Sequence, residues 1–195
     1  MNASNVSFYN MTINGNGQGG NAIIVASGLS GFVFDQMTAE NAAVNGILMN
    51  AYSATVVKNS TFTGNGHDQF VVAGAASGTS DGLQITGSVF DDSNSVGGAP
   101  FVALAVYNTN NGALIKNIVI SDNIVRYTGT GANETDGIAL YTESSSVYVQ
   151  NVVVSNNTIQ MSGASTAGNG IEVWSGANLT VCGNVTLITP GSESV

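Results

Sequence analysis

The chain has 195 residues, and only 8% of them are charged, against about 25% in an ordinary globular protein. Its net charge of −9 comes from twelve acidic residues against three basic ones, which excludes the basic clusters that hold nucleic acid phosphates. The length fits one domain over residues 1–195, no stretch is long and apolar enough to span a bilayer, and a single cysteine, Cys182, excludes an internal disulfide framework.

A short pattern recurs seven times along the chain, with starts separated by 23 to 35 residues. Its first and third positions are mostly β-branched or aromatic, and this alternation predicts a strand with one buried face. The copies are VSFYNMTI from Val6, FVFDQMTA from Phe32, TVVKNSTF from Thr55, LQITGSVF from Leu83, IVISDNIV from Ile118, VVVSNNTI from Val152 and LTVCGNVT from Leu179. Strands that stay fixed while loops change length are typical of a solenoid.

The fifth position of the pattern predicts a corner, because Asn, Asp and Gly tolerate left-handed backbone angles. The residues at this position are Asn10, Gln36, Asn59, Gly87, Asp122, Asn156 and Gly183. We expect the amides of this column to hydrogen-bond from coil to coil. We therefore expect Asn10, Asn59 and Asn156 to be inaccessible to solvent.

A second strand recurs between copies of the pattern. Its runs are NAIIV at Asn21, NGILM at Asn45, DQFVV at Asp68, FVALAV at Phe101, DGIAL at Asp136 and GIEVW at Gly170. Each repeat then has two recognisable strands and a corner, and helical patterning is absent. We predict an all-β parallel solenoid of about seven coils, roughly 30 Å long. Because solenoids usually need caps and none is evident, we expect a fragment of a longer protein, or ends that other chains cover.

Paired runs such as DGIALYT at residue 136 and VVVSNNTI at residue 152 give the chain a family resemblance. Over nearly its whole length the chain resembles the right-handed parallel β-helices of the pectate-lyase-like superfamily, and its coils are most similar to those of alginate C5-epimerases. The catalytic Asp-Pro-His motif and the calcium-binding nonapeptides of those epimerases are absent, so no residue role is transferred. The resemblance implies a right-handed parallel β-helix that acts on a polysaccharide, with a uronic-acid-containing glycan favoured, outside the cell or at its surface. Lyase, epimerase and glycosidase activity all remain open.

The first candidate catalytic residues in chain order are His67 and Asp68, in the run NGHDQF. Imidazole titrates near neutrality, so His67 is a candidate general base. The alternative is a solvated histidine in a turn.

Asp68 and Asp136 hold equivalent positions before the second strand, two coils apart, which would place their backbones about 10 Å from one another. Their side chains could then approach the roughly 6.5–9.5 Å separation of inverting glycosidases. Asn21, Asn45 and Asn169 fill the same position elsewhere. The column is therefore also explained as a requirement of the turn.

The two longest intervals between copies of the pattern are adjacent and end at Ile118 and Val152. Loops lengthened on adjacent coils can form the walls of a groove, so we place a candidate site on coils three to five. Arg126 would there neutralise the charge of a uronate. A Ca²⁺ ion held by Asp122, Glu134 and Asp136 is a further hypothesis, and simple drift in loop length is the alternative explanation.

Tyr141 and Trp174 both follow the last inward residue of the second strand, so we expect them to stack outward on successive coils. Exposed aromatic rings in a row offer a platform for sugars, and Glu172 would border this platform. The alternative is a cross-strand packing pair.

The outward column of the second strand is more apolar than solvent requires. It comprises Ile24, Leu48, Val71, Ala103, Ala139 and Glu172. Such a stripe predicts contact with a flanking domain or with a second copy of the chain. It also supports a rival hypothesis, a non-catalytic module of a surface assembly or phage tailspike. The preference of strands for β-branched residues is the simpler explanation.

Overall fold

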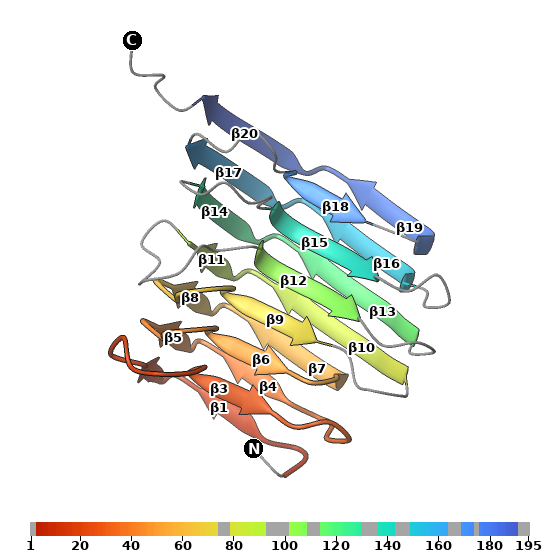
Figure 1. Cartoon of the computed structure of the whole chain (residues 1–195). Coiled ribbons are helices and arrows are strands. Elements are labelled where there is room, and N and C mark those ends of the chain that lie inside the picture. Colours follow the sequence, from red (N-terminus) through yellow and green to blue (C-terminus); the bar gives the residue numbers. More distant parts are fainter. Residues whose placement is uncertain are drawn as a thin grey trace.

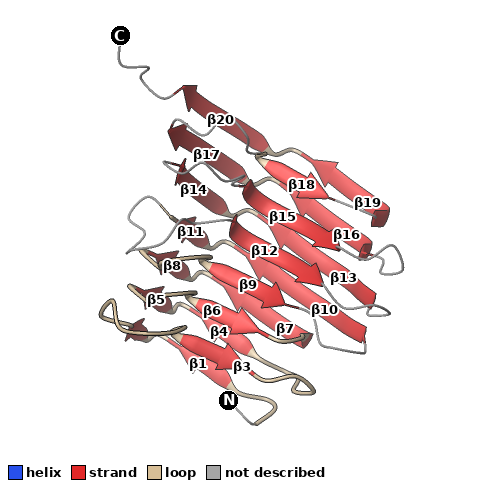
Figure 2. Ribbon diagram, viewed as in Figure 1, coloured by secondary structure: helices blue, strands red, loops and turns tan. Residues whose placement is uncertain are grey.

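The computed structural model describes residues 3–73, 79–92, 102–108, 114–129, 136–142, 149–163, 169–173 and 176–190. Regular structure in these ranges consists of twenty strands, without a helix (Figure 2). The strands stack into three parallel sheets, and the chain visits the sheets in turn as it winds from β1 to β20 (Figure 1). This is the predicted all-β parallel solenoid.

The first sheet contains the strands that the repeated pattern predicts. They are β1 (Ser7–Tyr9), β4 (Val33–Asp35), β7 (Ser53–Lys58), β10 (Thr79–Thr86), β13 (Leu114–Ser121), β16 (Val149–Ser155) and β19 (Gly176–Cys182). Phe8 pairs with Phe34, Phe34 with Val57 and Val57 with Ile85, so the predicted columns are the observed register. The prediction of seven coils is confirmed.

The second sheet was not predicted as a separate sheet, because its strands are the last residues of the same pattern, after the corner. They are β2 (Thr12–Asn14), β5 (Thr38–Glu40), β8 (Thr61–Thr63), β11 (Val89–Asp91), β14 (Ile124–Gly129), β17 (Thr158–Gly163) and β20 (Val185–Pro190). Each of the first six coils thus turns through three strands, where the sequence indicated two.

The third sheet contains the predicted second strands. They are β3 (Ile23–Val25), β6 (Ile47–Met49), β9 (Phe70–Ala73), β12 (Val102–Asn108), β15 (Asp136–Thr142) and β18 (Ile171–Val173). One register prediction was wrong: Ala105, not Ala103, pairs with Val71 and Ala139 in the outward column. Ala103 is buried in the main core instead.

The core fills the space between the three sheets. Aromatic rings stack along its axis, with ring centroids 5.1 Å apart for Phe8 and Phe34 and 5.0 Å apart for Phe62 and Phe90. Phe70 meets the ring of Phe62 edge-on at 5.8 Å. Each coil therefore buries its apolar face against the coils on either side, as stacking in a solenoid requires.

The predicted corner is confirmed, because all seven residues of its column have a positive φ, between 49° and 64°. The predicted amide ladder lies elsewhere: Asn10, Asn59 and Asn156 are exposed. The buried ladder is one residue further along, where Ser88 N–H donates to Asn123 Oδ1 at 2.9 Å. A left-handed residue turns its own side chain outward and the next side chain inward. The side chains one residue further along therefore accept hydrogen bonds from the buried backbone N–H groups.

A second left-handed column, which we did not predict, precedes the first-sheet pattern by one residue. It comprises Asn5, Gly31, Ala54, Gly82, Asn117, Asn151 and Asn178, with φ between 48° and 78°. On the later coils its amides form an exposed ladder: Asn178 Nδ2 donates to Asn151 Oδ1, and Asn151 Nδ2 donates to Asn117 Oδ1, both at 3.0 Å.

Candidate functional site

The turn that leads into the third sheet contains the two predicted catalytic aspartates. In this turn a side-chain oxygen of one coil accepts the backbone N–H of the next coil. Asn45 Oδ1 accepts the N–H of Asp68 at 3.0 Å, and Asp68 Oδ1 accepts the N–H of Val102 at 3.0 Å. Asp136 Oδ1 accepts the N–H of Asn169 at 2.7 Å. Both carboxylates therefore have a structural role, as the alternative explanation of this column expected.

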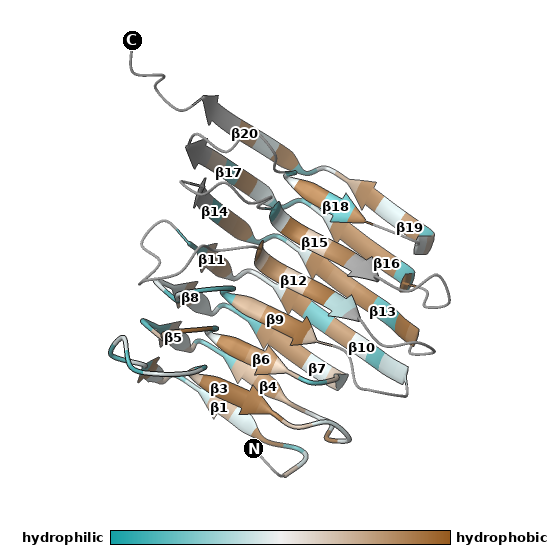
Figure 3. Ribbon diagram, viewed as in Figure 1, coloured by the Kyte–Doolittle hydropathy of each residue, from teal (hydrophilic) through white to brown (hydrophobic). Residues whose placement is uncertain are grey.

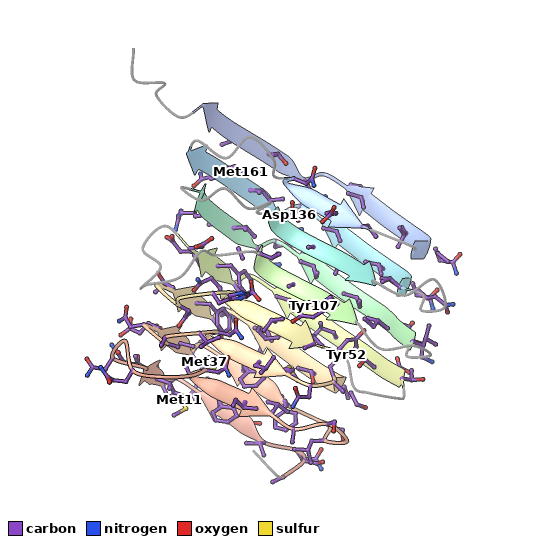
Figure 4. All side chains as sticks on the ribbon, in the orientation of Figure 1. Met11, Met37, Tyr52, Tyr107, Asp136 and Met161 are labelled. Atoms are coloured by element: carbon purple, nitrogen blue, oxygen red, sulfur yellow. The ribbon has the colours of Figure 1, made fainter. Side chains whose placement is uncertain are left out.

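Asp68 and Asp136 are buried, with 3% and 5% of their surface exposed. Val102 pairs with Asp136 on the next coil, and its backbone N–H donates to Asp68 on the preceding coil. The two carboxylates therefore lie two coils apart, as predicted. Figure 4 labels Asp136 at the start of β15.

Asp68 differs from Asp136 in its contact with His67. The Oδ2 atom of Asp68 lies 3.0 Å from Nδ1 of His67, whose side chain is 39% exposed. One carboxylate thus holds the turn through Oδ1 and orients the imidazole through Oδ2. The Asp68 carboxylate beside the ring raises the pKa of His67 above its usual value, against the opposing effect of partial burial. Because Nδ1 of His67 contacts the Asp68 carboxylate, Nε2 is the ring nitrogen that would exchange a proton with a substrate.

Two buried amides, which we did not predict, fix the turn that carries His67. Asn65 Nδ2 donates to Gln69 Oε1 at 2.7 Å, and Gln69 Nε2 donates to the Asn65 carbonyl at 3.3 Å. Asn65 Oδ1 also accepts the Ala42 N–H at 3.0 Å, which ties the turn to the preceding coil. Both amides are fully buried and hydrogen-bonded, so they hold the backbone around His67 in one conformation. The sequence signal was their position, two residues to either side of the only histidine.

Arg126 lies on the outer face of the second sheet, on β14. Its Nη1 is 3.4 Å from Asp91 Oδ2, and its Nε donates to Gln160 Oε1 at 3.2 Å. The guanidinium is thus already engaged by a carboxylate and an amide of the adjacent coils. Glu134, part of the hypothetical Ca²⁺ site, lies outside the described residues.

The predicted aromatic platform can be located only in part. The backbone of Tyr141 pairs with Tyr107 on the preceding coil, whereas the Tyr141 side chain and Trp174 lie outside the described residues. Glu172 is half-buried and pairs with Ala139 in the outward column, as predicted. Tyr107, labelled in Figure 4, is a further aromatic residue of this sheet that we did not predict.

The outward apolar stripe of the third sheet is less exposed than we expected. Val71, Ala105 and Ala139 are buried and form a small cluster of their own, against which Leu48 packs. Ile24, on the first coil, is 46% exposed. The third sheet is coloured mainly hydrophobic in Figure 3, but its middle is not a free surface.

A shallow hollow of about 370 Å³ lies on the outer face of the first sheet, on coils three to five. Val56 and Val119 contribute apolar surface, and Gln84 and Asn117 contribute amides. The hollow occupies the coils on which we predicted a groove. Its described lining comes from the first sheet, and most residues of the long loops that we predicted as groove walls lie outside the described ranges.

Within the described ranges, no three His, Cys, Asp or Glu side chains gather closely enough to hold a metal ion. A search of the same part of the chain for a helix long and apolar enough to cross a membrane finds none. Cys182 is exposed and has a free thiol.

Comparison with protein families gives one match, to the model described as a right handed beta helix region, over residues 1–186. Comparisons with curated proteins and with solved structures find no match for the chain. The family match covers nearly the whole chain and agrees with three parallel sheets visited in turn. The chain therefore belongs to the right-handed β-helix family.

Proposed function

We propose that this β-helix binds a polysaccharide, outside the cell or at its surface, and processes it by proton transfer at the His67–Asp68 pair. The proposal is carried by the two contacts of the Asp68 carboxylate, whose Oδ1 accepts the Val102 N–H while Oδ2 orients the partly exposed His67 ring. A buried carboxylate behind an accessible imidazole is an arrangement suited to general acid–base chemistry.

A glycan is the substrate class that fits the composition and the fold. The net charge of −9 and the three basic residues disfavour nucleic acid. Stacked coils present repeating rows of amide and hydroxyl side chains along one axis, which suits a linear polymer of sugars. The resemblance to the pectate-lyase-like superfamily supports the same class.

A uronic-acid-containing glycan suits a histidine base, because the uronate carboxylate acidifies the neighbouring C5 proton. His67 would accept that proton at Nε2 while Asp68 stabilises the imidazolium that forms. In a lyase reaction the electron pair of the broken C5–H bond would form the C4–C5 double bond, and the C4 oxygen would leave with a proton from water. In an epimerisation water would deliver a proton to C5 from the face opposite His67. Arg126 has no part in this scheme, because Asp91 and Gln160 already engage its guanidinium.

Proton NMR of a panel of uronic and neutral polysaccharides, with and without calcium, tests the proposal. We expect an unsaturated-uronate signal or changed anomeric signals with the wild type, and their loss in His67→Gln. Asp68→Asn keeps an Oδ1 acceptor for the Val102 N–H but removes the charge behind His67, so it should slow the reaction. Asp136→Asn is the matched control, since Asp136 holds the same ladder position two coils away.

Unchanged spectra with the wild type across the whole panel would refute processing. Equal activity in the wild type, His67→Gln and Asp68→Asn would show that the chemistry lies elsewhere. Loss of activity in Asp136→Asn alone would place it at the other aspartate.

A second candidate function is a non-catalytic module of a surface assembly. It is favoured by the apolar side chain of Ile24, which lies in the outward column of the third sheet and is 46% exposed. Under this alternative, substitutions at His67 and Asp68 would leave function unchanged, and Ile24→Lys would not.

A further inference from the structure

An accessible apolar column runs along the outside of the first sheet on coils three to six. Its members alternate along their strands with buried core residues, and each is half-buried or exposed. The column comprises Val56, Gln84, Val119 and Val153, which pair in register from coil to coil. Most of this column is apolar and none of it lies in the core, so it offers apolar surface to a ligand.

Polar columns lie on both sides of the apolar one. On coils four to six the side toward the strand ends carries hydroxyl groups, from Thr86, Ser121 and Ser155 in register. The side toward the strand starts is the second left-handed column, which supplies the amides of Asn117 and Asn151. Strands β10, β13 and β16 bring the three columns side by side (Figure 1). We call these three columns the first-sheet face.

The amides of the first-sheet face are held in one orientation by their ladder. Asn151 Nδ2 donates to Asn117 Oδ1 at 3.0 Å, and Asn117 Nδ2 donates to Asp81 Oδ1 at 2.6 Å. A primary amide has two N–H donors and an oxygen with two lone pairs, and each ladder bond uses one donor and one lone pair. Both asparagines are exposed, so the remaining groups can bind a ligand hydroxyl without the entropic cost of fixing a mobile side chain.

The hollow of about 370 Å³ lies on this face because two small residues interrupt the amide column. Ala54 and Gly82 hold on coils three and four the left-handed positions that Asn117 and Asn151 hold on the next two coils. A Cβ at Gly82 would lie 3.5 Å from the Ala54 backbone nitrogen, which is an ordinary contact, so a side chain would fit there. The surface is therefore recessed beside the first amides of the ladder.

The first-sheet face suits a neutral ligand. On coils four to six its columns consist of amide, hydroxyl, valine and glycine residues. The lysines that border the face are paired with aspartates: Lys116 lies 3.1 Å from Asp81, and Lys58 lies 3.2 Å from Asp35. A polyanion would meet a chain of net charge −9 with both of these cations already neutralised.

An extended neutral glycan matches this arrangement in spacing and in chemistry. Successive coils lie about 4.8 Å apart, which is close to the length of one sugar unit in an extended polysaccharide. The C–H face of a sugar ring is apolar and gains from covering Val119 or Val153. The ring hydroxyls would then reach an amide on one side and a serine on the other.

We infer that the first-sheet face is a second, non-catalytic binding surface, for an extended neutral glycan that lies along the axis of the coils. The inference rests on the proposed function for its class of ligand, but it requires no chemistry at His67. His67 precedes the third sheet, so a glycan on the first sheet leaves the turn of His67 open to another chain or to another segment of the same chain.

Affinity electrophoresis in native gels tests the inference with soluble arabinoxylan, galactomannan and mixed-linkage β-glucan. At least one of these neutral polysaccharides should retard the wild type. The double variant Asn117→Gly/Asn151→Gly removes both amides, and glycine tolerates the left-handed φ, as Gly82 does in the same column. Its dissociation constant should be higher by about tenfold or more. Gly82→Asn fills the hollow and should also weaken binding.

Asn156→Gly is the matched control, because it removes an exposed amide at another left-handed position of coil six, outside the first-sheet face. Asn156→Gly and His67→Gln should both be retarded as strongly as the wild type. Circular dichroism and thermal melting check that each variant is folded.

The absence of retardation by all three neutral polysaccharides would overturn the inference. Equal retardation of the wild type and the double variant would overturn it too, as would a loss in Asn156→Gly as large as in the double variant. Loss of retardation in His67→Gln would assign binding to the turn of His67 instead. Retardation that depends on the amides, without any change in the proton NMR spectra, would refute the proposed processing and support this second surface.

Discussion

Substitutions of Asp68 separate the structural role of its carboxylate from its contact with His67. Asp68→Ala removes the acceptor of the Val102 N–H, a bond of 3.0 Å at a residue that is only 7% exposed. A buried donor left without a partner costs about 1–3 kcal/mol. Asp68→Asn retains Oδ1 and loses only the contact with His67, which solvent screens because the ring is 39% exposed. We expect Asp68→Ala to be less stable than Asp68→Asn by about 1–3 kcal/mol.

Urea unfolding followed by circular dichroism measures this difference directly. The chain already has an asparagine in this role: at the equivalent position on the preceding coil, the amide oxygen of Asn45 accepts the Asp68 N–H. Equal destabilisation by Asn and by Ala would refute the reasoning, since it would show that the negative charge and not the Oδ1 acceptor holds the turn.

Substitutions at three further positions test the pKa of His67, a buried hydrogen bond of the ladder and the close packing below the turn of His67. The pKa of His67 is raised, so the stability that the protein gains from the contact with Asp68 is fully present below about pH 6.5 and is lost as the pH rises through the raised pKa. The free energy of unfolding of His67→Gln should therefore differ most from that of the wild type in urea titrations at acidic pH, and the two values should converge at alkaline pH. Asn123→Ala leaves the Ser88 N–H without its acceptor and should cost about 1–3 kcal/mol in urea unfolding, whereas Asn123→Ser should cost less; equal losses would contradict the ladder. Gly46→Ala would place a Cβ 2.5 Å from the Gln69 carbonyl oxygen, below the turn of His67, and should lower the melting temperature; an unchanged melting temperature would show that this turn can yield.

The fold was largely predictable because a solenoid repeats its constraints on every coil. Val57 and Ile85 stand in one column in the sequence and pair in one register in the structure. Seven copies average out the exceptions, such as Thr55 in an otherwise apolar column. The left-handed corner was predictable for the same reason, since Asn, Asp and Gly recur there.

The features that we missed have short or ambiguous signals. The second sheet contains strands such as Thr12–Asn14, too short for alternation to distinguish them from the end of the preceding strand. Ala103 was exchanged for Ala105 because two alanines in one strand give no composition signal for the face that each occupies, and the structure places Ala103 in the core and Ala105 in the outward column. The second left-handed column includes Ala54, a residue that gives no composition signal for φ of 48°.

The sequence named candidate residues for the site but could not supply the contacts between them. The sequence placed Asp68 and Asp136 in the same column as several asparagines. Because a carboxylate and an amide accept a ladder hydrogen bond equally well, this column gave no sign of which aspartate has a second role. The structure distinguishes them by what surrounds the second oxygen: at Asp68 it is the imidazole of His67, held by a turn whose amides, Asn65 and Gln69, are fully buried. A ladder needs only one acceptor atom at each position. Among the residues that the structure describes, Asp68 has a charged contact that asparagine could not supply, and this makes Asp68→Asn and Asp136→Asn an informative pair.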